Sequence, residues 1–247
     1  MRADDSAFGE GRGCYTSARV EGGVARHAAR HARRLARDAA TLRLPPVDEE
    51  RCLRAFAELS RAAFGDDPGI VRLQASRDGA GRPHLVGVPR ALGPPRPAWT
   101  AVVAPFPHPG PAPWGGAKVT GHLHHLVARE AALAASADEA LLFDASGRLV
   151  EGARTNLVAV LADGTLVAPP AARGAVAGVA LAIVRERGER IVERDLGRDD
   201  LSAVRELVAL NAVRGAVALV RLDARAVGDG APGPTATRLA ALLDTEA

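Results

Sequence analysis

The sequence predicts an α+β fold, because segments of strand character and amphipathic helices alternate irregularly in both halves of the chain. The segment 105–116 (PFPHPGPAPWGG) is dominated by Pro and Gly, which prevent regular structure, and it separates the two halves. Apolar residues make up 47% of the 247 residues and charged residues 25%, as in ordinary globular chains. We therefore expect an N-terminal α+β domain over 1–104, a linker over 105–116 and a C-terminal α+β domain over 117–247.

The elements of each half follow from hydrophobic periodicity and from turn residues. Gly22-Gly23 forms a turn after the first strand, and Pro45-Pro46 ends the helix that follows. Asp48 is placed to cap the next helix. The first half is expected to contain strands at 14–21, 69–76 and 98–104, and helices at about 24–42 and 49–64. The second half is expected to contain helices at about 120–135, 177–187, 199–204 and 234–243, and strands near 139–144, 156–162, 190–194, 205–210 and 216–222.

Basic residues are concentrated in the first helix, although the net charge is only +3. At 100° per residue, four arginines lie opposite the apolar stripe and form a solvated face: Arg26, Arg30, Arg33 and Arg37. No aromatic side chains that could stack on bases lie nearby, so we expect no nucleic-acid partner. Arg34 differs, because it flanks the apolar stripe and can reach toward a neighbouring element.

No segment predicts a membrane or secretory location. No apolar run approaches the ~20 residues that a spanning helix needs, and the first residues contain no apolar signal core. Cys14 and Cys52 do not form a disulfide framework. We expect a cytoplasmic protein without a membrane partner.

The chain contains a single lysine, Lys118, among 32 basic residues. Arginine replaces surface lysine well, but it does not form Schiff bases with aldehydes. A lone lysine in an arginine-rich chain is therefore a candidate amine nucleophile.

The stretch from Lys118 to Asn156 resembles the fold-type-IV (class IV) family of pyridoxal-phosphate enzymes. In that family a Schiff-base lysine precedes a helix and a D-E-A-L-like strand, and a glutamate then leads into a small-residue and Asn motif. Lys118, Asp138-Glu139-Ala140-Leu141, Glu151 and Asn156 match this order. The resemblance implies a two-domain fold with pyridoxal 5'-phosphate between the domains.

The resemblance covers nearly the whole chain and assigns further cofactor contacts. Arg34 matches an arginine that binds the cofactor phosphate, and the loop before 179 resembles a second phosphate element. A glycine loop that opens a helix can direct backbone N–H groups at an anion. The cofactor-binding set that the resemblance implies is Arg34, Lys118, Glu151, Asn156, Gly178, Val179, Ala180, Asn211 and Ala212.

The chemistry of the cofactor explains two of these residue types. Its ring withdraws electrons only while the ring nitrogen is protonated, which requires a nearby carboxylate, and Glu151 is the candidate. Lys118 is the candidate catalytic residue. This chain departs from the family pattern at His122, where Tyr or Arg is common, and at Ala180 and Ala212, where hydroxyl residues are common.

The run CYTSARV and the turn SRDGAGRP look more like aminodeoxychorismate lyase than like the transaminases. The expected reaction converts 4-amino-4-deoxychorismate to 4-aminobenzoate and pyruvate, a folate precursor step. The alternatives are a transaminase for D- or branched-chain amino acids and a family member that has lost the cofactor. Arg82 and His122 are candidate substrate residues.

The resemblance also implies a homodimer acting on a small-molecule amine. No metal is expected, because the sequence supplies no carboxylate or cysteine next to His122, His124 and His125 to complete a ligand set.

Overall fold

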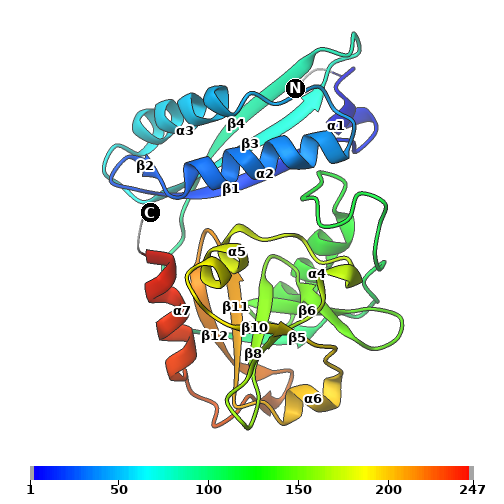
Figure 1. Ribbon diagram of the computed structural model, residues 1–247, viewed down its shortest axis with the longest axis vertical. Coiled ribbons are helices and arrows are strands. Elements are labelled where there is room, and N and C mark those ends of the chain that lie inside the picture. The colour runs from blue at the N-terminus through cyan, green and yellow to red at the C-terminus, as the bar shows by residue number, and fades with distance from the viewer. Residues whose placement is uncertain (1–2, 245–247) are drawn as a thin grey trace. The chain divides into compact units, whose positions relative to one another are not determined.

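The computed structural model describes residues 3–244 and divides them into two compact units. The first comprises residues 3–94 and 117–122, and the second comprises 95–116 and 123–244. Figure 1 shows helices and strands mixed in each of them. The α+β class is confirmed.

The first unit is a four-stranded antiparallel sheet in the order β2-β1-β3-β4, covered by two helices. Its strands are β1 (Cys14–Glu21), β2 (Val24–Ala25), β3 (Gly69–Arg77) and β4 (Pro83–Ala91), and its helices are α1 (Ser6–Gly9), α2 (Ala28–Thr41) and α3 (Glu49–Phe64). Helices α2 and α3 pack against the sheet and against each other. Leu35, Phe56 and Leu73 meet in the core between them.

Helix α3 begins and ends where its sequence dictates. The Asp48 side chain accepts a hydrogen bond from the Glu50 N–H, and Gly65 ends the helix with a positive φ of 53°. The expected bounds of 49–64 are confirmed.

The second unit contains a nine-stranded mixed sheet with the path β10-β9-β8-β11-β12-β5-β6-β7, and β13 pairs with β12. Its strands are β5 (Ala98–Val103), β6 (Glu139–Phe143), β7 (Leu149–Gly152), β8 (Asn156–Val160), β9 (Leu166–Ala168), β10 (Ile191–Glu193), β11 (Glu206–Asn211), β12 (Gly215–Leu222) and β13 (Arg225–Ala226). Its helices are α4 (Leu123–Ala134), the 3₁₀ turn η1 (Ala171–Arg173), α5 (Val179–Glu186), α6 (Arg198–Ser202) and α7 (Pro234–Asp244).

The central strands of this sheet are buried on both faces. Leu157 and Leu207 enter one core, whereas Val158 and Val208 enter another with side chains of α5 and α7. Because successive side chains of a strand point to opposite faces, every residue of β8 is buried. No helix of residues 3–244 is long and apolar enough to cross a membrane.

The compact units interleave along the chain and differ from the expected boundaries. The strand expected at 98–104 pairs in parallel with β12 and β6, so it belongs to the second unit. The segment 117–122 pairs with β1 and groups with the first unit. Neither pairing is visible in local periodicity, because both join residues far apart in sequence. The division into two functional domains stays a prediction.

Candidate functional site

Two hydrogen bonds hold the backbone of Lys118 within the first unit. Its N–H donates to Asp38 Oδ2 on α2 at 2.9 Å, and its carbonyl accepts the N–H of Tyr15 on β1 at 2.9 Å. The side chain extends over an aromatic ring, with Nζ 4.8 Å from the Tyr15 ring centroid. The backbone of Lys118 is thus fixed, while its amine remains at the end of a flexible stem.

Arg34 lies buried in the same unit and points from α2 to β1. One of its terminal nitrogens donates to Thr16 Oγ1 at 2.5 Å, and the same oxygen lies 2.6 Å from His31 Nδ1. Burial lowers the pKa of Arg34 to about 10, opposed by the charge of Asp38. Among the residues that the structure describes, Arg34 Nε is buried without a hydrogen-bond partner. A buried cation with an unpaired N–H group is suited to bind an anion.

Glu151 lies on β7 in the second unit and is only 2% exposed. His125 Nε2 is 2.9 Å from its Oε1, His108 Nε2 is 3.7 Å from the same oxygen, and the Val176 N–H donates to Oε2 at 3.0 Å. Burial by itself would raise the pKa of this carboxyl, but His108, His125 and the Val176 N–H outweigh burial and lower the pKa to about 2. Glu151 is therefore a buried carboxylate that stays ionised.

Three histidines gather beside Glu151, and the sequence had not grouped them. One ring nitrogen from each of His108, His124 and His125 lies within 4.8 Å of the others, a grouping that could hold a metal ion. However, Nδ1 of His108 accepts the Gly110 N–H at 3.0 Å, which places the proton of a neutral His108 on Nε2. Ligation through Nε2 would require that backbone bond to break. We therefore interpret His108 as a hydrogen-bond donor rather than a metal ligand.

The N-terminus of α5 supplies the glycine loop expected before Val179. Gly178 is the N-cap residue, and a Cβ at this position would overlap Asn156 Oδ1. Asn156 Nδ2 in turn donates to the Val176 carbonyl at 2.9 Å. The first N–H groups of a helix, here those of Val179 and Ala180, have no acceptor within the helix. Asn156 thus positions the loop, and the helix start offers N–H groups to an anion.

Asn211 and Ala212 lie at the end of β11, where Asn211 holds a turn. Asn211 Oδ1 accepts the N–H groups of Val213 and Arg214, and its Nδ2 donates to the Arg154 carbonyl at 3.3 Å. The side chain of Asn211 therefore shapes the loop after β11. Ala212 carries no polar side-chain atom, so any contact it makes with an anion is through its backbone.

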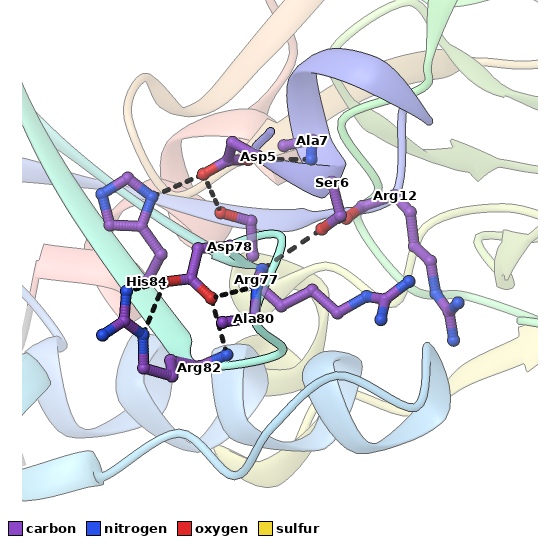
Figure 2. Close-up of polar contacts among 10 residues, drawn as sticks. Asp5, Ser6, Ala7, Arg12, Arg77, Asp78, Ala80, Arg82 and His84 are labelled. Atoms are coloured by element: carbon purple, nitrogen blue, oxygen red, sulfur yellow. Dashed lines mark hydrogen bonds and ion pairs between the residues drawn. The ribbon is translucent and has the colours of Figure 1, made fainter. Parts of the chain in front are cut away.

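The two candidate substrate residues lie in the first unit. Figure 2 shows Arg82 paired with Asp78 in the β3–β4 turn, where Arg82 Nε donates to Asp78 Oδ2 at 2.8 Å. Asp78 thus engages the guanidinium that we expected to attract a substrate carboxylate. His122 Nε2 lies 3.3 Å from the Tyr15 hydroxyl, and its Nδ1 lies 2.8 Å from the Thr120 carbonyl. His122 therefore shares Tyr15 with Lys118.

A family model for class IV amino-transferases matches residues 13–222, so the chain belongs to the class IV aminotransferase family. The family, the enzyme class and pyridoxal phosphate as its cofactor are thereby confirmed at the level of the family.

Among curated proteins, the chain is similar to a branched-chain-amino-acid aminotransferase of Pseudomonas aeruginosa, with 26% identity over 121 residues. That match covers 48% of this chain and 39% of the relative, which is less than two thirds of the relative's length.

Solved structures match nearly the whole chain. A fold IV-transaminase, CpuTA1, from Curtobacterium pusillum is 26% identical with a TM-score of 0.84, covering 99% of this chain and 90% of that one. The PLP-bound form of a hypothetical aminotransferase from Mycobacterium tuberculosis is 23% identical with a TM-score of 0.84, covering 99% and 92%. A putative 4-amino-4-deoxychorismate lyase from Legionella pneumophila is 19% identical with a TM-score of 0.87, covering 99% and 94%. At these last two identities the likeness shows the fold alone.

Several side chains with clear contacts to the candidate residues were not expected from the sequence. Asp38 was read as one position of an amphipathic helix, Tyr15 as a strand residue and His108 as part of a linker. No local pattern distinguishes them. His124 and His125 stood out in the sequence only beside His122, as possible metal ligands, and Glu151, the partner of His125, lies 26 residues further along the chain.

Proposed function

We propose that this chain is a pyridoxal-phosphate-dependent aminotransferase in which Lys118 binds the cofactor covalently. The observation that carries the proposal is the single lysine of the chain, which falls at the family's lysine position and whose backbone is hydrogen-bonded at both its N–H and its carbonyl. Covalent binding of the cofactor requires a side-chain amine that can move while its backbone is held in place. Lys118 has both properties.

The residues present fit the cofactor. Arg34 Nε is a buried donor without a partner among the described residues, which a phosphate oxygen would satisfy. A Cβ at Gly178 would overlap Asn156 Oδ1, so glycine at the start of α5 leaves room for the side chain that positions this loop. Arg34, Val179 and Ala180 would hold the phosphate, and the loss of hydroxyl donors at Ala180 and Ala212 places that task on backbone N–H groups and one guanidinium.

When bound, the cofactor supplies an aldehyde that condenses with amines and a protonated ring that withdraws electrons from the reacting carbon. Lys118 Nζ would hold the cofactor through its aldehyde carbon and, when free of it, would move a proton at the substrate carbon. Glu151 would hold the proton at the ring nitrogen. Arg34 would bind and orient the phosphate.

Membership of the family does not define the donor and acceptor of the amino group. We favour transamination over the lyase reaction. The two relatives at 26% identity are a branched-chain-amino-acid aminotransferase and a transaminase by name. Arg82, our candidate for a substrate carboxylate, is paired with Asp78 in an exposed turn, so its contacts add no support for the lyase.

The second candidate is aminodeoxychorismate lyase. The specific observation in its favour is the run CYTSARV, of which Thr16 and Ser17 lie on β1 of the first unit with Arg19. In this reaction Lys118 would remove the ring proton beside the substrate amine, pyruvate would leave from the adjacent carbon, and the ring would aromatise to 4-aminobenzoate.

One experiment tests both the cofactor and the reaction. The purified chain is mixed with pyridoxal phosphate, dialysed and examined for a visible absorption band, beside Lys118→Ala and Lys118→Arg. We expect the band in the wild-type chain alone, because arginine keeps the charge but not the nucleophilic amine. Absence of a band from the wild-type chain would contradict the proposal and favour a family member without a cofactor.

The loaded enzyme is then incubated with L- and D-amino acids plus 2-oxoglutarate, and separately with aminodeoxychorismate. Formation of glutamate from an amino-acid donor supports transamination. Release of pyruvate together with 4-aminobenzoate, without glutamate, means that the lyase is the correct reaction.

A homodimer also stays a prediction from the family resemblance. Sedimentation at micromolar concentration tests it, and a particle of one chain mass, 25.6 kDa, would contradict it.

A further inference from the structure

We propose that His125 and His108 are positioning residues that fix the Glu151 carboxylate as the partner of the cofactor's ring nitrogen. This inference rests on the proposed function, because it assigns a task to Glu151. All its members belong to the second unit: Glu151 on β7, His125 on α4, His108 in the segment after β5 and Val176 in the loop before α5.

The hydrogen-bond directions follow from the groups themselves. An ionised carboxylate only accepts hydrogen bonds, so His125 Nε2, at 2.9 Å from Oε1, must carry a proton. The Val176 N–H can only donate, and it reaches Oε2 at 3.0 Å. Each oxygen of Glu151 is therefore held by a donor from a different segment of the chain.

His108 adds a donor whose tautomer is set by the backbone. Its Nδ1 accepts the Gly110 N–H at 3.0 Å, so a neutral His108 carries its proton on Nε2. That N–H lies 3.7 Å from Glu151 Oε1, longer than a hydrogen bond, and contributes as a dipole directed at the carboxylate. The ring is buried and only 4% exposed, which keeps this dipole in place.

Aromatic contacts restrict the two rings further. The His108 and His124 rings meet edge to face with centroids 5.1 Å apart, and the His124 and His125 rings lie 4.0 Å apart. His124 thus packs against both donors. A histidine cluster of this kind limits the rotation of the two rings that face Glu151.

The hydrogen bonds to Glu151 leave acceptor capacity for the cofactor. A carboxylate offers about four lone-pair sites, and hydrogen bonds from His125 and Val176 occupy two of them, while His108 Nε2 lies 3.7 Å away. A further N–H donor can be accommodated, and a protonated pyridine ring presents a single N–H. The cluster therefore fixes the orientation of the carboxylate without saturating it.

The test compares His125→Leu, His125→Gln and His108→Leu with a matched control, Thr235→Val. Gln can place an amide N–H where the His125 Nε2 proton lies, whereas Leu keeps the volume and removes the donor. Thr235 is buried and donates to the Glu206 carboxylate at 2.7 Å elsewhere in the same unit, so its variant also loses a buried donor to a carboxylate.

We expect His125→Leu to lower kcat about tenfold to a hundredfold with little change in KM, since a hydrogen bond to a charged group is lost. The visible absorption band of the bound cofactor should shift, and cofactor retention through dialysis should fall. His108→Leu should show a smaller effect of the same kind, and His125→Gln should recover most of the loss. Thr235→Val should leave band and retention unchanged even if the chain melts earlier.

The inference is overturned if His125→Leu and Thr235→Val behave alike, or if His125→Gln is as impaired as His125→Leu. It is also overturned if Zn²⁺ binds one per chain in a manner that both His124→Leu and His125→Leu abolish, because the cluster would then be a metal site. A wild-type chain without a cofactor band makes the proposed function fail. In that case, proton-nitrogen spectra of the histidines still test whether His108 and His125 carry protons on Nε2.

Discussion

The pKa values of two buried glutamates on adjacent antiparallel strands are shifted in opposite directions. Glu139 on β6 is 1% exposed and Glu151 on β7 is 2% exposed, so burial does not distinguish them. Burial raises the pKa of Glu139 to about 7, only partly opposed by Arg154 and Thr155. For Glu151 burial also acts upward, but His108, His125 and the Val176 N–H lower the pKa to about 2.

The difference lies in the donors. Glu139 accepts the Thr155 hydroxyl at 2.9 Å and the Ala140 N–H at 3.0 Å, and the nearest cation, Arg154 Nε, is 3.9 Å away. Glu151 receives an imidazole N–H as well as a backbone N–H. The Thr155 hydroxyl only partly compensates the loss of water around Glu139, whereas the histidine side chains and the Val176 N–H together outweigh that loss at Glu151. Nearby donors, rather than the degree of burial, account for the opposite pKa shifts of the two carboxyl groups.

The largest expected effect separates the two glutamates by function. Glu151→Gln keeps the shape of the side chain but removes the charge, and we expect kcat to fall about a thousandfold, ~4 kcal/mol in the barrier. Steady-state kinetics of the loaded enzyme measure this, with Glu139→Gln as the matched control. Equal losses in both variants would mean that the comparison does not identify the functional carboxylate.

The next effect concerns stability and pH. The folded-state pKa of Glu139 is raised to about 7 from 4.5, so the folded chain binds the extra proton between these values and loses stability as pH rises through them. The shift of 2.5 (7 − 4.5) corresponds to about 3 kcal/mol above pH 7. We expect Glu139→Gln to remove this dependence, measured as urea unfolding of both chains between pH 5 and 8. A wild-type curve parallel to that of the variant would contradict the assignment.

A smaller effect tests whether Asn156 positions the loop from which the Val176 N–H donates to Glu151. Asn156 Nδ2 donates to the Val176 carbonyl at 2.9 Å, and Asn156→Ala removes that bond. We expect a loss of about 1 kcal/mol in stability and a several-fold faster loss of cofactor on dialysis. Retention equal to that of the wild-type chain would show that Asn156 does not position this loop.

The smallest effect tests the neutral donor of Glu139. Thr155→Val removes the hydroxyl at 2.9 Å, so the pKa of Glu139 should rise further and the pH window of the stability change should move upward. The midpoint of unfolding free energy against pH measures the shift, and kcat should be unaffected. A downward shift would show that another group determines the acidity of Glu139.

Sequence reasoning located the long elements well because they carry their own periodicity and stop signals. Helix α3 has a capping Asp48 and a terminal Gly65, and its bounds were predicted correctly. Strand β4 was missed because Pro83, Gly87 and Pro89 interrupt it and its side chains are mostly exposed at a sheet edge. Strand β7, which carries Glu151, is four residues long and buried on both faces, so it shows no alternation.

Candidate residues were predicted where one residue type carries the chemistry. Lys118 is the only amine side chain available, and Arg34 stood out at the edge of an apolar stripe, where the structure places it buried against β1. His108 could not be predicted, because its meeting with Glu151 depends on the path of a Pro- and Gly-rich segment. Contacts between an irregular segment and residues far away in the chain produce no periodic pattern in the sequence.

The lone lysine also determines how this protein can be labelled. Activated esters and reductive methylation attack primary amines and leave the guanidinium groups of its arginines untouched, so Lys118 is the one side chain that they can modify. Because hydrogen bonds to Asp38 and Tyr15 hold its backbone in place, a ¹³C-methyl group added to Nζ reports motion of the side chain alone. Because a dimethylated Nζ can no longer condense with an aldehyde, the labelled chain serves as the form without covalently bound cofactor, and the α-amino group at the start of the 247-residue chain contributes the other methyl resonance.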